Sequence, residues 1–116
     1  MKAKRVALLA SVNLLFAAVP IHAHHRLELV YDETKPIVLK GTVTKIDWSN
    51  PHVLLYLDGV GSQMNWKLEM GSPNALLRTG WKIDTFRRGD HVMVNAYPAR
   101  DGSNLGYATK VARTAE

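Results

Sequence analysis

The first 23 residues have the hydropathy pattern of a secretory signal peptide. A basic start at residues 1–5 precedes an apolar run of 14 residues from Val6 to Val19, and Pro20 ends that run. Ala23 then supplies the small residue that a signal-peptide cleavage site requires. Because the apolar run is shorter than the ~20 residues that span a bilayer, we expect cleavage after Ala23 and no stable membrane anchor afterwards. The mature chain is therefore predicted to be periplasmic or secreted.

Beyond residue 36, apolar and polar residues alternate in short runs, which is the period typical of β-strands. Clusters of glycine, proline, asparagine and aspartate separate the runs and predict turns. Strands are expected at residues 37–48, 52–57, 65–70, 91–97 and 105–112. The mixed and charged stretch of residues 24–36 is expected to form an N-terminal arm or an edge strand.

The alternation slips once, inside the first of these runs. Leu39, Gly41 and Val43 fall on one face of the strand, whereas Ile46 and Trp48 fall on the other. A β-bulge near residues 44–45 would turn both sets towards one core.

One segment has helical rather than strand character. Ser72 followed by Pro73 is a typical N-cap and first-turn pair, and Gly80 is placed to end the helix. A short helix is therefore expected over residues 74–79.

The predicted order is three strands, one helix and two strands, which is the layout of the OB-fold. We predict a mainly β fold for residues 37–116, a small five-stranded OB-like antiparallel barrel with one short helix between strands 3 and 4. An open antiparallel sheet or another small barrel is the alternative. The signal peptide, residues 1–23, and the arm, residues 24–36, precede this domain.

Composition excludes several classes of function. The chain has no cysteine, which excludes disulfides, thiolate metal sites and a thiol nucleophile. Cleavage removes three of the 15 Lys and Arg residues, so against 10 Asp and Glu the net charge falls from +5 to +2. Nucleic-acid-binding domains usually have a clustered basic face, and none is expected here. No hydrolase, zinc-protease or nucleotide-binding motif is present, so we predict a binding protein rather than an enzyme.

Histidines give the sharpest hypothesis about chemistry. Cleavage after Ala23 makes His24 the amino-terminal residue, so its α-amine and its imidazole can chelate one ion. His25 adds a second imidazole, and His52, just after an Asn-Pro turn, could complete the site. Nitrogen-rich sites of this kind favour Cu(II), with Zn(II) and Ni(II) behind it. Because such ligands titrate between ~6.5 and ~8.0, affinity should fall as the pH falls.

These residues also have purely structural interpretations. His24 and His25 can be an unstructured polar start, and His52 can hydrogen-bond the turn that precedes it. His91 lies on the outward face of its strand and is interpreted as an ordinary exposed residue. The three tryptophans are interpreted as core or core-edge residues: Trp48, Trp66 and Trp81.

The alternative hypothesis is a protein- or glycan-interaction module of the cell envelope. Its surface would combine two neighbouring strands with a basic loop: Tyr56, Lys67, Glu69, Arg78, Arg87 and Arg88. An ion pair with Lys67 or an arginine is the expected role of Glu69. A hydrolase that uses Glu69 with His52 is a further alternative.

Two motifs resemble a known family. Residues 41–52, GTVTKIDWSNPH, and residues 71–81, GSPNALLRTGW, resemble the signatures of an uncharacterised family of small exported bacterial proteins. Residues 88–90 and 101–104 resemble its last part. Members typically begin the mature chain with two histidines and a serine, whereas here Arg26 follows the pair. The resemblance implies export and a compact β-barrel-like fold, and it implies no particular activity.

Overall fold

The computed structural model describes residues 26–61 and 64–115, and the chain divides into two compact units, residues 1–30 and 31–116. The predicted leader, its cleavage site, and His24 and His25 lie outside the described residues. Residues 26–30 of the first unit are helical, so the expectation of an edge strand is wrong there. Tyr31 instead begins the second unit and forms a β-bridge with Ala99. In the described ranges, no helix has the length and apolar character needed to cross a membrane.

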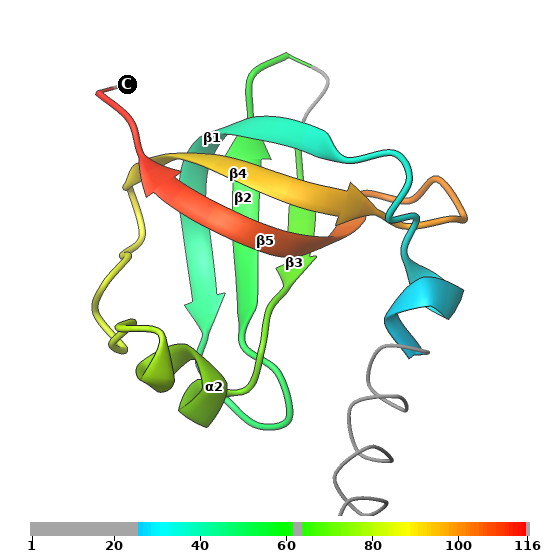
Figure 1. Ribbon diagram of the computed structural model, residues 1–116. Helices are drawn as coiled ribbons and strands as arrows, with labels where there is room; N and C mark the ends of the chain where they lie inside the picture. Colours follow the sequence, from blue (N-terminus) through cyan, green and yellow to red (C-terminus); the bar gives the residue numbers. More distant parts are fainter. Residues whose placement is uncertain (1–25, 62–63, 116) are drawn as a thin grey trace, which may run out of the picture. The chain divides into compact units, whose positions relative to one another are not determined.

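The second unit is a closed five-stranded barrel with the strand order β1-β2-β3-β5-β4 (Figure 1). The strands are β1 (Ile37–Asp47), β2 (Leu54–Gly59), β3 (Trp66–Glu69), β4 (His91–Pro98) and β5 (Leu105–Arg113). The helix α2 (Pro73–Arg78) follows β3 and lies at the opposite end of the barrel from the β2–β3 turn (Figure 1). The prediction of a five-stranded barrel with one helix between strands 3 and 4 is confirmed.

One pairing departs from the expected antiparallel barrel. β3 pairs with β5 in parallel, Lys67 opposite Leu105 and Glu69 opposite Tyr107. Between β3 and β5 the chain passes through α2 and β4. As a result, β3 and β5 run in the same direction where they pair to close the barrel. This pairing covers only three residues of each strand, whereas β5 continues to Arg113.

The predicted bulge in β1 is present. The register against β2 shifts between Val43 and Lys45. Leu39 and Val43, which precede the shift, are buried, and Ile46 and Trp48, which follow it, pack against the same core. The bulge therefore directs both apolar sets of β1 inward, as the sequence predicts.

Local capping explains α2. The Ser72 hydroxyl oxygen accepts a hydrogen bond from the Ala75 N–H at 3.2 Å, and Pro73 occupies the first turn. Gly80 has φ +96°, a left-handed conformation that costs glycine little. The helix predicted over residues 74–79 is thus confirmed within one residue at each end.

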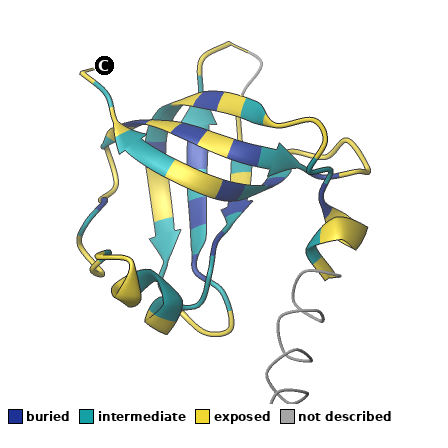
Figure 2. Ribbon diagram, in the orientation of Figure 1, coloured by how far each residue is buried: buried dark blue, intermediate teal, exposed yellow. Residues whose placement is uncertain are grey.

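Inward side chains from the strands form one apolar core (Figure 2). Buried and exposed residues alternate along β4, so that Val92, Val94 and Ala96 face the core. The other fully or almost fully buried strand residues are Leu39, Val43, Leu55, Leu57 and Leu68. The three tryptophans are partly buried and pack against this core, which confirms their core-edge interpretation.

A turn at residues 32–34 gives a pH-dependent prediction. Hydrogen bonds from the hydroxyl and the backbone N–H of Thr34 lower the pKa of Asp32 below its ordinary 3.8. The stability that this carboxylate contributes is therefore present above pH 3.8 and lost as the pH falls through the lowered value. Thr34→Val is expected to raise the pKa of Asp32 towards 3.8, as measured by NMR titration. Asp101, whose pKa is lowered by Ser103, is the internal control and should not change.

Candidate functional site

A histidine and a glutamate meet where β2 begins and β3 ends. His52 lies just before β2, and the Nδ1 atom of its ring is 3.1 Å from the carbonyl oxygen of Met70. A carbonyl oxygen only accepts hydrogen bonds, so we assign the proton of the neutral ring to Nδ1. The opposite nitrogen, Nε2, is 3.5 Å from Oε1 of Glu69. The backbone thus orients the ring so that Nε2 faces the carboxylate.

Tyr31 holds the other oxygen of Glu69. Its hydroxyl donates a hydrogen bond to Oε2 of the carboxylate, and its side chain is almost wholly buried, at 1% exposure. The Tyr31 ring also lies 5.8 Å from the ring of Tyr107, the residue opposite Glu69 on β5. The Glu69 side chain is 12% exposed and that of His52 is 36% exposed. The carboxylate is therefore held in a fixed position, and the histidine ring at its edge is accessible.

This arrangement has two possible chemistries. When His52 is protonated, it forms an ion pair with Glu69. When His52 is neutral, the lone pair on Nε2 and the carboxylate oxygen are two adjacent metal ligands. A ligating histidine usually donates its second N–H to a carbonyl or a carboxylate, which is the bond that Nδ1 makes to Met70. Within the part of the chain that the structure describes, no group of three or more metal-ligating side chains occurs, so further ligands would have to come from elsewhere.

A family profile gives independent information on the whole chain. The profile described as "Family of unknown function (DUF6152)" matches residues 10–108. The chain belongs to this family. No curated protein matches the chain.

The DUF6152 match confirms the predicted resemblance to an uncharacterised family, and it brings no activity with it. The matched range includes His24, His25, Tyr31, His52 and Glu69. The candidate site therefore belongs to the DUF6152 region of the chain.

The residues of the predicted interaction surface are divided among three places. Tyr56 and Lys67 are opposite each other on β2 and β3, and Lys45 of β1 lies over the Tyr56 ring, with Nζ 5.4 Å from its centroid. Glu69 lies on the same outer face, where its contacts are with Tyr31 and His52. The prediction for Glu69 named Lys67 or an arginine and did not identify either of these contacts.

The basic loop of the DUF6152 domain lies against β1 rather than β3. Arg87 and Arg88, with Ile83 and Phe86, line a groove of about 590 Å³ whose other wall is residues 44–46. Arg87 also pairs with Asp84 at 3.6 Å. Arg78, at the end of α2, is not among the residues of this groove.

Tyr31 is the site residue that sequence reasoning missed, because no motif marks it and only His24 and His25 of the arm were assigned a role. His91 is exposed on β4, as predicted, with its Nδ1 atom 3.2 Å from the Thr42 hydroxyl.

Proposed function

We propose that this DUF6152 chain is an exported metal-binding protein that takes Cu(II), or less readily Zn(II), at the site of His52 and Glu69. The ligands are Nε2 of His52, a carboxylate oxygen of Glu69, and the amine and imidazole groups of the mature residues His24 and His25. The observation that carries the proposal is the orientation of His52: Nδ1 faces the Met70 carbonyl, and Nε2 lies 3.5 Å from Glu69.

The position of Tyr31 connects the two halves of the proposed ligand set. Tyr31 is hydrogen-bonded to Glu69 and is only six residues after His25. This short separation in sequence is the reason for proposing one shared site rather than two separate ones.

The donor set explains the choice of metal. Three imidazoles and an amine give a nitrogen-rich site, and Cu(II) binds such sites more tightly than the other divalent first-row ions. One carboxylate oxygen is compatible with either Cu(II) or Zn(II). No thiolate is present to favour Cu(I).

The test is a Cu(II) titration of the exported protein after its amino terminus has been established by mass spectrometry. We expect the mature chain to begin at His24. Removal of His24 and His25, or the substitution His52→Ala, should each weaken Cu(II) affinity by about tenfold or more. His91→Ala is the matched control, because His91 is an exposed strand histidine and should leave affinity unchanged. A different amino terminus, or a deletion without effect, would contradict the proposal.

A further inference from the structure

A second feature, separate from the His52–Glu69 site, is the β5 edge beyond Tyr107, which pairs with no other strand among the described residues. The β3–β5 pairing ends at Tyr107, and β5 runs on for six more residues. On its other edge, β5 remains paired with β4 up to Arg113. Thr114 donates its N–H to the His91 carbonyl, so Thr114 faces β4. Backbone groups alternate in direction along an antiparallel strand, so those of Val111 and Arg113 face away from β4.

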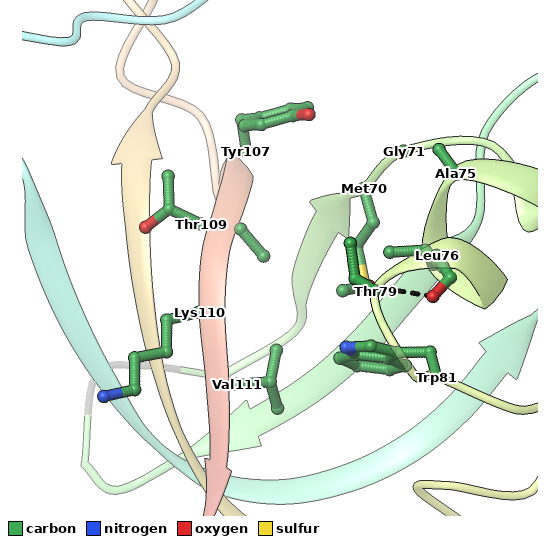
Figure 3. Close-up of a pocket in the computed structure, with 11 residues that line it drawn as sticks. Met70, Gly71, Ala75, Leu76, Thr79, Trp81, Tyr107, Thr109, Lys110 and Val111 are labelled. Carbon is green, nitrogen blue, oxygen red and sulfur yellow. Dashed lines mark hydrogen bonds between the residues drawn. The ribbon is translucent and has the colours of Figure 1, made fainter.

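A groove of about 550 Å³ lies along this open edge (Figure 3). One wall is β5 from Tyr107 to Val111, and the other is formed by the residues after β3 and by α2. Figure 3 shows Val111 directed towards Leu76 and Trp81 across the groove, whereas Lys110 points to the other side of β5. The groove therefore presents apolar side chains beside unpaired strand backbone.

This combination is suited to an added β-strand. An extended peptide bonds to the open strand edge through its main chain, and its alternate side chains enter pockets beside that edge. An unpaired edge of this kind is otherwise a site of uncontrolled association. Side chains of such a peptide that point inward would contact Leu76 and Trp81, and those that point outward would lie beside Lys110.

The charge of the groove lining indicates which kind of peptide would bind there. Among the described residues that line the groove there is no aspartate or glutamate, and Lys110 is the one charged side chain. Lys110 is in no ion pair within the described residues. Arg113, further along β5 and outside the lining, pairs with Asp90. A strand with outward carboxylates would complement these walls.

Two other occupants are disfavoured by the same charges. A second copy pairing edge to edge would bring β5 cations near their own counterparts. The amino-terminal 27 residues of the chain contain no acidic residue at all.

We infer that the β5 edge, residues 109–113, binds an extended acidic segment of a partner protein by strand addition. Apolar residues of that segment enter the groove lined by Leu76, Trp81 and Val111, and its alternate acidic residues face Lys110. This inference does not depend on metal binding, because no His52 or Glu69 atom takes part in it.

The test uses a nine-residue peptide of alternating glutamate and valine with blocked ends, titrated into the isotope-labelled mature protein. NMR should show saturable shifts at the Val111 and Arg113 amides and slower solvent exchange at both. Peptides N-methylated on alternate residues supply the main-chain control: one methylation pattern should abolish binding, and the other should preserve it. Binding by both, or by neither while the unmodified peptide binds, would overturn strand addition.

Lys110→Glu is expected to weaken binding of the acidic peptide by about fivefold. Lys40→Glu, an exposed residue on β1, is the matched control and should have no effect. Equal binding of a lysine–valine peptide would overturn the charge argument. Without peptide, slow solvent exchange of the Val111 amide that depends on protein concentration would assign the edge to a second copy. Slow exchange that does not depend on protein concentration would assign the edge to the chain's own amino terminus. Either result would overturn the proposal.

Discussion

Gly41→Ala is expected to destabilise the barrel by about 3 kcal/mol, because a methyl group at this position overlaps backbone atoms of β2. An ideal Cβ on Gly41 would lie 2.2 Å from the Asp58 carbonyl oxygen and 2.6 Å from the Gly59 Cα. Neither atom can rotate away, and β1 and β2 pair at this point, with Gly41 opposite Gly59. Small domains are stable by about 5–15 kcal/mol, so the expected loss is a large share of the total.

Urea denaturation of the wild-type and variant proteins measures this loss. Gly71→Ala is the matched control, because its Cβ would make only an ordinary 3.4 Å contact with the Ala75 side chain. We expect Gly71→Ala to change the free energy of unfolding by less than about 1 kcal/mol. A Gly41→Ala protein as stable as the Gly71→Ala protein would show that the two strands can separate locally without cost.

Most of the barrel could be predicted because its signals are local. The alternation of Val53, Leu55 and Leu57 identifies an inward face, and all three side chains are fully buried. The slip in β1 predicts a bulge for the same reason: only a bulge directs both apolar sets towards one core. Ser72 and Gly80 give the two ends of α2 in the same local way.

The candidate site could be predicted only in part, because it depends on long-range pairing. His52 was recognised as a potential ligand from its position after a turn. Its contact with Glu69 follows from the β2–β3 register, Leu54 opposite Glu69, which places His52 two residues beyond that pair. Tyr31 reaches Glu69 across 38 positions of sequence, through the arm's bridge to Ala99. No local pattern encodes that bridge, so the sequence pointed to Lys67, the same-face neighbour of Glu69, or to an arginine as its partner.

The parallel pairing of β3 with β5 could not be predicted for a related reason. Strand alternation shows which face is buried, but it does not show which strands are neighbours. The order in which the strands close the barrel determines that β5 meets β3. Because β3 is short, the β5 edge beyond Tyr107 has no partner strand among the described residues. The groove beside β5 is therefore a property of topology and not of any motif.

Glu69→Gln is expected to weaken Cu(II) binding by the mature protein by about 10- to 100-fold, on the proposal that Glu69 is a ligand. Glutamine has nearly the same size, and its carbonyl oxygen can still accept the hydrogen bond from Tyr31. It removes the negative charge, and it replaces one of the two carboxylate oxygens with an amide NH₂ group, which cannot ligate the metal. The barrel should remain folded, because the Glu69 side chain is outside the apolar core.

Competition titration with a Cu(II) chelator measures the affinity, and electron paramagnetic resonance of the bound ion reports the change in ligands. Glu33→Gln is the matched control, because it makes the same change of charge at a partly exposed residue of the turn before β1. Tyr31→Phe should weaken binding less than Glu69→Gln, because it loosens the carboxylate without removing it. If Glu69→Gln bound Cu(II) as tightly as Glu33→Gln while His52→Ala bound it weakly, Glu69 would orient the histidine rather than ligate the metal.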